Sequence, residues 1–433
     1  MTALRAGAAV ADISPRVPAP LAGYPPINLY PGGPQDHRGY TGRTGPCEGI
    51  ADPVCARALA VSDDNGVAVL IAMDVCAVPA AFSHRVRSRL SAGYGVPADS
   101  VMITASHNHS GPDYTGYWEP VDPSVTALVE DLAVAAAGEA LARRRPATVG
   151  LANGWLDGLT VNRRDPARPV DPAVPVLRLD GAHGEPVAVV YGFACHPVTA
   201  GPANRLVSAE YPGAASRLVE AAFDGAVALF VNGGAGNINP RAFPYRDTPN
   251  VVQLTRGLPP EQAGSVRSVA QARRLGTVLG GEVVRVAAQL ATGPAVGGVR
   301  TSRREVAARL KDRAELDAFL NHMPHEPHAV ADWRPGGELV TEVASLRIGP
   351  LALIGIPGEP FVETALSLQR DEPAGAAPAV RVAGYANDYP GYLPPPAQLA
   401  ENRYESVATP LSADGVQAVI DAAADLRSRL DAA

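Results

Sequence analysis

Apolar residues recur along this chain with two different periods, and segments of the two kinds alternate from one end to the other. Alternating or continuous apolar runs of short length, rich in β-branched residues, are typical of strands. They lie at 6–13, 54–61, 66–74, 100–105, 147–153, 174–179, 186–193, 226–231, 296–305, 340–347, 350–355 and 379–383. Segments with a helical period lie between them, at 79–92, 124–144, 210–222, 260–291, 310–321 and 413–431.

This interleaving predicts an α/β (α+β) fold with mixed β-sheets and flanking helices. The turn Asp63-Asp64-Asn65-Gly66 joins two strand-like runs and predicts a hairpin, and the runs 340–347 and 350–355 predict another. Two stretches, 16–50 and 384–408, lack a regular period and are expected to be loops. No repeat or low-complexity linker divides the 433 residues, so a single catalytic domain spanning 1–433 is the simplest expectation.

Composition narrows the function classes. The net charge is −7 and no run of Lys or Arg stands out, which argues against a nucleic-acid partner and favours a small-molecule substrate. No apolar stretch approaches the ~20 residues that cross a bilayer, so no stable membrane association is expected. The N-terminus lacks the apolar core of a secretory signal, and the expected location is cytoplasmic. The four cysteines are expected to be reduced and buried. Whether the chain forms a homo-oligomer stays open.

Residues with metal-binding side chains follow several predicted strands. His107 and His109 come after 100–105, His196 ends 186–193, and Glu359 follows 350–355. Ligands in α/β architectures gather at such strand ends. Each histidine alone is also compatible with a hydrogen-bonded core residue, but a carboxylate after a buried strand is costly unless it is paired or bound to metal.

A second group of histidines lies in the irregular stretch 320–337, at His322, His325 and His328. Metal binding and a plain surface loop are both open there. The surface loop is favoured, because no regular element would fix the geometry of the ligands.

Segments in the same order along the chain resemble the neutral/alkaline ceramidase family. The resemblance extends from about residue 6 to about residue 430. Its segments are Ser106-His107-Asn108-His109-Ser110-Gly111-Pro112, Val161-Asn162-Arg163, Phe193-Ala194-Cys195-His196, Pro357-Gly358-Glu359 and the tyrosine loop through Arg403-Tyr404-Glu405.

The resemblance implies one zinc ion per chain, held by His107, His196, Glu359 and Tyr392, with Tyr389 as the alternative tyrosine. Such a ligand set suits Zn²⁺ and leaves a position for water, although Mn²⁺ or Fe²⁺ stays open. The resemblance also implies that His109, Arg163 and Tyr404 face the substrate. Asp74, at the end of the run 66–74, could orient a ligating histidine or be a simple turn residue.

Two departures from the family change the expected mechanism and substrate. Asn239 stands where the family has its nucleophilic serine, so we expect direct attack by zinc-activated water, with Asn239 hydrogen-bonding the substrate or the water, or serving only as a turn residue. The chain ends soon after the tyrosine motif, so no C-terminal immunoglobulin-like domain is expected. The predicted function is hydrolysis of an amide C–N bond, other than a peptide bond, in a small N-acyl substrate. An ester or lactone hydrolase and a non-catalytic zinc-binding homologue are the alternatives.

Overall fold

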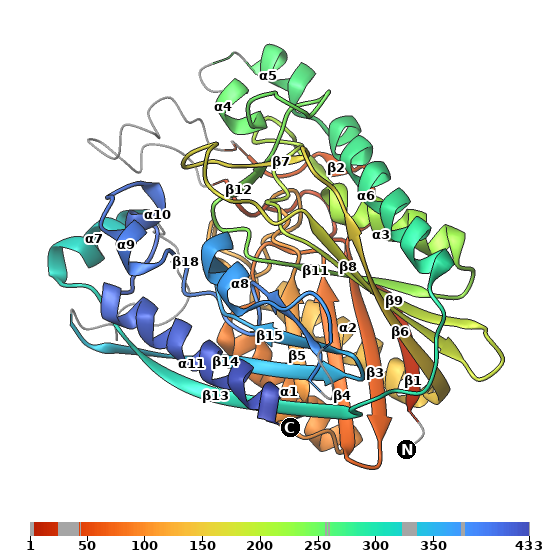
Figure 1. Cartoon of the computed structure of the whole chain (residues 1–433). Coiled ribbons are helices and arrows are strands. Elements are labelled where there is room, and N and C mark those ends of the chain that lie inside the picture. The colour runs from red at the N-terminus through yellow and green to blue at the C-terminus, as the bar shows by residue number, and fades with distance from the viewer. Residues whose placement is uncertain are drawn as a thin grey trace.

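Two β-sheets of unequal size form the framework of the molecule (Figure 1). The computed structural model describes residues 4–24, 43, 45–255, 258, 260–322, 336–373 and 377–432. In spatial order the larger, eight-stranded sheet contains β11 (Val227–Asn232), β9 (Pro186–Phe193), β8 (Ala173–Gly181), β6 (Arg145–Trp155), β1 (Arg5–Asp12), β3 (Cys55–Asp63), β4 (Gly66–Met73) and β5 (Val101–Ala105). The four-stranded sheet contains β13 (Val299–Arg309), β14 (Glu338–Ile348), β15 (Leu351–Gly355) and β17 (Ala379–Ala383).

Both sheets are mixed. In the large sheet, β11 is parallel to β9 and β4 is parallel to β5, while the other neighbours are antiparallel. Three two-stranded pairs lie outside the sheets: β10 (Leu206–Val207) with β2 (Gly49–Ile50), β12 (Ile238–Pro240) with β7 (Thr160–Asn162), and β16 (Glu359–Pro360) with β18 (Tyr392–Leu393). The predicted fold class, with mixed sheets and flanking helices, is confirmed.

The two sheets pack face to face between outer helices. On β3, Leu59 points into the core between the sheets, where it joins Leu346 and Leu353, while its neighbours Ala58 and Ala60 face the helices on the other side. This alternation follows from the two-residue period of a strand. The resulting order of layers is helices, large sheet, small sheet, helix.

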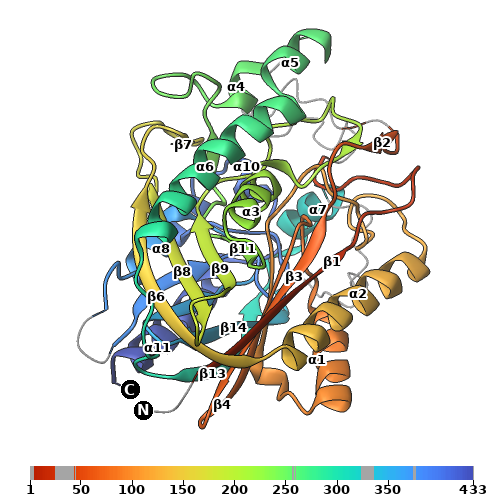
Figure 2. The ribbon, with the colours of Figure 1, turned by 90° about the vertical axis from the view of Figure 1, so that its right-hand side faces the viewer.

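The helices that cover the outer face of the large sheet are α1 (Ala80–Tyr94), α2 (Pro123–Ala142), α3 (Glu210–Ala222) and α6 (Val269–Gln289). Figure 2 shows α3 and α6 lying beside β8, β9 and β11, with α1 and α2 beside β1 and β3. The outer face of the small sheet is covered by α11 (Ala413–Ala432) and α8 (Val362–Leu368). The remaining helices are short: η2 (Ala98–Ser100), α4 (Val251–Thr255), α5 (Pro260–Val266), α7 (Arg313–His322), α9 (Pro396–Leu399) and α10 (Tyr404–Val407).

A buried ion pair links the large sheet to the small one. Arg87 of α1 donates to the carbonyl oxygen of Val101 on β5, at 2.9 Å from Nη2, and pairs with Glu342 of β14 at 2.7 Å. Both partners of the pair are buried. Removing one partner of such a pair leaves an uncompensated buried charge, so the pair restrains the relative position of the two sheets.

The predicted elements match the observed ones closely, with two informative differences. The strand expected near 296–305 begins at Val299, because Gly297 and Gly298 adopt left-handed φ values of 87° and 67° that no regular strand contains. The expected loop 384–408 includes β18 and the four-residue helices α9 and α10, which are too short to show a period in sequence. Within the described residues, no helix combines the length and apolarity needed to cross a bilayer.

The large sheet splays apart, and this brings its two edges together at one end. Strands β1 and β6 pair only through Arg5 and Ala6, so the two halves diverge, and β11 at one edge contacts β5 at the other. The segments that follow β5, β9 and β11 therefore meet, together with the segment that follows β15 of the small sheet. These are the strand ends where the sequence places its histidines and Glu359.

Candidate metal centre

His107 lies immediately after β5 in a strained backbone conformation. Its φ is +66°, in the left-handed region that non-glycine residues seldom adopt. The ring of Tyr385, itself at φ +56°, stacks on the imidazole with 4.3 Å between centroids and 17° between planes. Both side chains are buried. Strain of this kind persists only where the surroundings hold it, and such residues cluster at functional sites.

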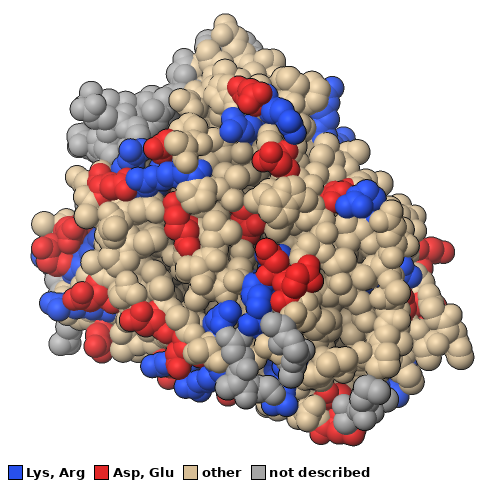
Figure 3. Space-filling model, viewed as in Figure 1, with Lys and Arg blue, Asp and Glu red and all other residues tan. Residues whose placement is uncertain are grey.

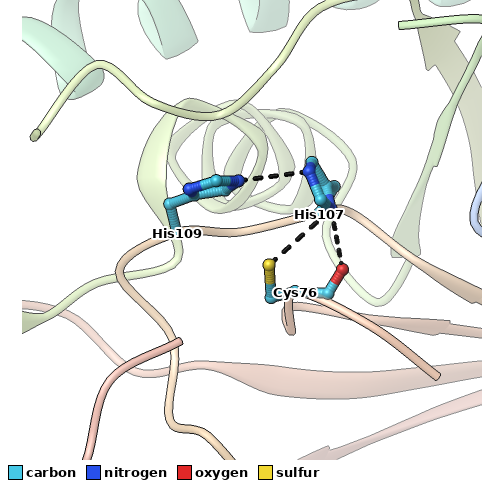
Figure 4. A group of neighbouring side chains, drawn as sticks. All are labelled: Cys76, His107 and His109. Atoms are coloured by element: carbon cyan, nitrogen blue, oxygen red, sulfur yellow. Dashed lines mark hydrogen bonds between the residues drawn. The ribbon is translucent and has the colours of Figure 1, made fainter. Parts of the chain in front are cut away.

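Backbone carbonyls hold both His107 and His196 by the same ring nitrogen. Nδ1 of His107 lies 2.9 Å from the carbonyl oxygen of Cys76 (Figure 4), and Nδ1 of His196 lies 2.6 Å from that of Ala235. A carbonyl oxygen can only accept, so Nδ1 donates and carries the proton of each neutral ring. Each Nε2 then carries a lone pair rather than a hydrogen, which is the arrangement that a metal-ligating histidine needs.

Glu359 is delivered by a turn after β15. Gly358 has φ +58°, and a Cβ atom there would collide with the carbonyl oxygen of Gly391. The turn therefore needs glycine at this position. Glu359 then pairs with Tyr392 as register partners in β16 and β18.

The three predicted ligands His107, His196 and Glu359 converge on one point. Oε2 of Glu359 lies 3.3 Å from Nε2 of His107 and 3.1 Å from Nε2 of His196, and each side chain is 1% exposed. Within the described residues these form one of two groups of metal-ligating atoms that all lie within 4.8 Å of one another. The other group is Cys76, His107 and His109, where Nδ1 of His107 is already held by the Cys76 carbonyl.

Electrostatics favours a cation among these atoms. Burial, helped by Arg163, lowers the pKa of His196 to about 4, so its ring is neutral at neutral pH. Burial raises the pKa of Glu359, but the adjacent His107 and His196 outweigh it and keep that pKa well below its usual range. Nε2 of His196 and Oε2 of Glu359 are both buried without a well-formed hydrogen bond. Tetrahedral Zn²⁺ with bonds of about 2.0–2.1 Å separates its ligand atoms by roughly 3.3 Å, close to the spacings seen here.

Tyr389 and Tyr392, the two tyrosines considered as the fourth ligand, both lie beside this cluster. The hydroxyl of Tyr389 donates to Oε1 of Glu359 at 2.6 Å. The ring of Tyr392 is nearly parallel to that of His196, with 6.4 Å between centroids. The hydroxyl of Tyr389 is thus engaged by the Glu359 carboxylate. The hydroxyl of Tyr392 makes no such bond, which favours Tyr392 as the candidate fourth ligand.

His109 lies next to His107, and the Nε2 atoms of the two rings are 3.1 Å apart (Figure 4). Its Nδ1 is buried without a hydrogen-bond partner, and burial, followed by the effects of His107 and His196, holds its pKa well below the usual value. The ring of Tyr24 meets it edge to face at 4.8 Å, and Nη2 of Arg43 donates to its backbone oxygen at 2.8 Å. His109 is thus a neutral imidazole whose Nε2 faces the cluster, while its Nδ1 packs against Gly23.

Arg163 and Tyr404 lie around Tyr392. The guanidinium carbon of Arg163 is 5.2 Å from the ring centroid of Tyr392 and 5.8 Å from that of Tyr404. The rings of Tyr392 and Tyr404 meet edge to face at 5.5 Å. Asn239 lies on β12, which pairs with the strand preceding Arg163, and its Oδ1 is buried without a hydrogen-bond partner. Its Nδ2 makes a long hydrogen bond of 3.4 Å to Asn250.

The structure also identifies one residue, Asn232, whose importance the sequence did not reveal. Asn232, at the end of β11, donates from Nδ2 to the carbonyl oxygens of Ser106 at 2.9 Å and Cys195 at 3.2 Å, the residues just before His107 and His196. It therefore fixes the two histidine segments relative to each other. An Asn at the end of an apolar strand was the only available signal in the sequence.

The structure also bears on the expectations for Asp74, for the histidines of the stretch 320–337 and for the cysteines. The side chain of Asp74 pairs with Arg57 at 2.8 Å and accepts from the Cys55 amide, so it orients no histidine, and the turn-residue interpretation is the better one. His325 and His328 lie outside the described residues, and only the backbone of His322 is described. All four cysteines are buried, as expected.

The fold and the cluster together define an α/β protein with mixed sheets and a buried histidine–carboxylate centre at converging strand ends. The family model for the N-terminal part of the neutral/alkaline non-lysosomal ceramidases matches residues 35–245. The neutral ceramidase of Mycobacterium tuberculosis is 27% identical over 405 residues, covering 76% of this chain and 63% of that relative. The neutral ceramidase of Pseudomonas aeruginosa is 25% identical over 427 residues, covering 80% of this chain and 62% of the relative.

The crystal structure of the Pseudomonas aeruginosa neutral ceramidase has the same fold, with a TM-score of 0.74 at 22% identity over 99% of this chain and 75% of that one. A structure of a ceramidase complexed with C2 gives a TM-score of 0.73. The resemblance to the neutral/alkaline ceramidase family is thus confirmed. This chain spans less than two thirds of the length of the two curated relatives, at 63% and 62%.

The close approach of Gly23 to His109 generates a prediction. A Cβ at Gly23 would collide with Cγ and Nδ1 of the His109 ring, and Gly23 has φ +87°. Gly184 has a similar φ of +85° but nothing near its Cβ position, which makes it a matched control. Gly184→Ala should lower the free energy of unfolding by about 1 kcal/mol through backbone strain alone. Gly23→Ala should lower it by about 3 kcal/mol, because the clash adds to the strain. Equal losses in denaturant titrations would contradict this packing.

Proposed function

We propose that this chain is a zinc-dependent hydrolase that cleaves an amide bond in a small N-acyl substrate. The observation that carries the proposal is the convergence of two Nε2 lone pairs, from His107 and His196, on a buried Glu359 carboxylate whose nearest oxygen has no hydrogen bond of its own. The relatives support the choice of bond, because they are named neutral ceramidases and ceramide is an N-acyl amide.

His107, His196 and Glu359 would hold the zinc, with Tyr392 as the fourth ligand. When bound in such a site, zinc lowers the pKa of a coordinated water toward about 7 and polarises a carbonyl oxygen. The carbonyls of Cys76 and Ala235 keep the two imidazoles in the tautomer that this role requires.

The other residues would act on the substrate itself. Arg163 supplies a fixed positive charge for a developing oxyanion, and the hydroxyl of Tyr404 is a second candidate donor; preorganised donors of this kind each contribute a few kcal/mol. His109, whose Nε2 faces the cluster 3.1 Å from Nε2 of His107, could carry a proton from the attacking water to the leaving amine. Asn239 has no nucleophilic atom, so its free Oδ1 would accept a hydrogen bond from the substrate, and no covalent acyl-enzyme would form.

The charge distribution supports a small substrate rather than a nucleic acid. On the face shown in Figure 3, which faces the viewer as in Figure 1, basic and acidic side chains are interspersed and the basic ones form no continuous stripe. A phosphate backbone needs such a stripe.

Substituting a ligand should remove zinc and activity together. His196→Ala and Glu359→Ala should each drop zinc from about one per chain to near zero and reduce turnover by at least ~10³-fold, because the cation loses a neutral imidazole or its only carboxylate. His84→Ala, an exposed histidine on α1, is the control and should keep both. Elemental analysis and hydrolysis of a short-chain ceramide in detergent provide the readouts. Full turnover by purified His196→Ala would refute the metal assignment.

A matched amide and ester with the same acyl chain should separate the proposed reaction from its ester or lactone alternative. We expect turnover of the amide, no burst of the released amine, and no acylated protein by mass spectrometry during steady state. Asn239→Ala should keep zinc and lose roughly tenfold in kcat/KM, as for one lost hydrogen bond to the substrate. Hydrolysis of the ester alone would select the alternative. Zinc binding without turnover of either compound would select a non-catalytic homologue.

A further inference from the structure

The carboxylate that pairs with Arg163 is Glu405 of α10. Nε of Arg163 donates to Oε1 of Glu405 at 2.8 Å. Its Nη2 is buried without a hydrogen-bond partner, and the guanidinium lies over the rings of Tyr392 and Tyr404. A guanidinium is planar and rigid, so fixing Nε on a carboxylate fixes the direction in which Nη2 points.

Glu405 serves a second arginine at the same time. Its other oxygen, Oε2, accepts from Nη1 of Arg164 at 3.1 Å, and the side chain of Glu405 is only 3% exposed. Burial raises the pKa of Glu405, but the two guanidinium groups outweigh burial and keep the pKa below its usual value, so the carboxylate is ionised. The single negative charge of Glu405 is thus shared by the two guanidinium groups of Arg163 and Arg164. The positive charge of Arg163 is therefore only partly neutralised.

Arg164 has a second carboxylate partner, Glu401, which does not pair with Arg163. Nη2 of Arg164 donates to Oε2 of Glu401 at 2.8 Å, and Arg168 pairs with the other oxygen of Glu401 at 2.7 Å. The α10 helix that carries Glu405 is itself fixed, because the buried Nζ of Lys311 donates to the carbonyl oxygen of Ser406. Glu405 is therefore the one carboxylate that the described structure pairs with Arg163.

We propose that Glu405 is a positioning residue, which aims the free edge of the Arg163 guanidinium at the substrate and, by sharing its charge with Arg164, leaves Arg163 able to stabilise a developing negative charge. This inference rests on the proposed function, in which Arg163 faces the substrate. Within the described residues, the side chain of Glu405 makes its hydrogen bonds and ion pairs to Arg163 and Arg164, and to none of the four proposed zinc ligands.

Glu405→Gln tests the proposal, with Glu401→Gln as the matched control. Both changes remove one carboxylate from the same ionic cluster, but only the first removes the partner of Arg163. We expect Glu405→Gln to keep about one zinc per chain, to lose roughly 30-fold in kcat on short-chain ceramide, and to change KM less than about threefold, as for a misaligned group of the transition state. Glu401→Gln should stay within about twofold of the unmodified protein in kcat.

A double-mutant cycle distinguishes positioning from a general structural role. If Glu405 acts through Arg163, then Glu405→Gln should cost less than about twofold in kcat when introduced into Arg163→Ala, since the group it aims is gone. An undiminished 30-fold loss in that background would overturn the proposal. Should Glu405→Gln fail to fold, Glu405→Asp takes its place, because it keeps the charge but its shorter side chain cannot reach both arginines.

A structural readout separates this inference from the proposed function. A crystal structure of the Glu405→Gln or Glu405→Asp protein should show the Arg163 guanidinium turned away from the rings of Tyr392 and Tyr404, with the zinc ligands unmoved. A guanidinium that stays in place would refute the positioning role even if the protein is active. Failure of the unmodified, zinc-loaded protein to hydrolyse any N-acyl compound would refute the proposed function instead.

Discussion

Three buried atoms that carry lone pairs and no hydrogen face one another in this structure. Their mutual repulsion is relieved only by a positive charge between them. They are Nε2 of His107, Nε2 of His196 and Oε2 of Glu359, separated by 3.1–3.3 Å along the two edges that end at the carboxylate. A proton on one Nε2 would require an imidazolium ion, because both Nδ1 atoms already donate to carbonyls. Burial opposes that charge and holds the pKa of His196 at about 4. A divalent cation meets the need without this penalty.

The residues of this cluster come from the ends of strands in both sheets. The large sheet delivers both histidines at the ends of β5 and β9, and the small sheet delivers Glu359 after β15. Asn232 ties the two histidine segments together, and the pairing of β16 with β18 sets Glu359 beside Tyr392. The strain at His107 and Tyr385 is stored where these segments meet. The geometry of the centre therefore depends on the packing of the two sheets as much as on any one side chain.

Periodicity was enough to predict the fold class and most elements, because each long strand and helix has its own apolar pattern. It could not predict that β1 lies between β6 and β3, or that the sheet splays so that β11 meets β5, since strand pairing is decided by distant segments. The histidines and Glu359 stood out as polar residues at the ends of apolar strands, but the choice of His107, His196 and Glu359 as ligands followed from the resemblance to the ceramidase family. The carbonyls of Cys76 and Ala235 were not, because a backbone group leaves no trace in the sequence. The pairing of Glu405 with both arginines was equally hidden, because it joins residues 241 and 242 positions apart.

Anomalous diffraction at the zinc edge, from crystals grown with one equivalent of Zn²⁺, tests the central claim most directly. We expect one peak, about 2.0–2.2 Å from Nε2 of His107, Nε2 of His196 and an oxygen of Glu359, with the Tyr392 hydroxyl facing it. No peak among these atoms, or a peak only in the histidine-rich stretch 320–337, would contradict the account.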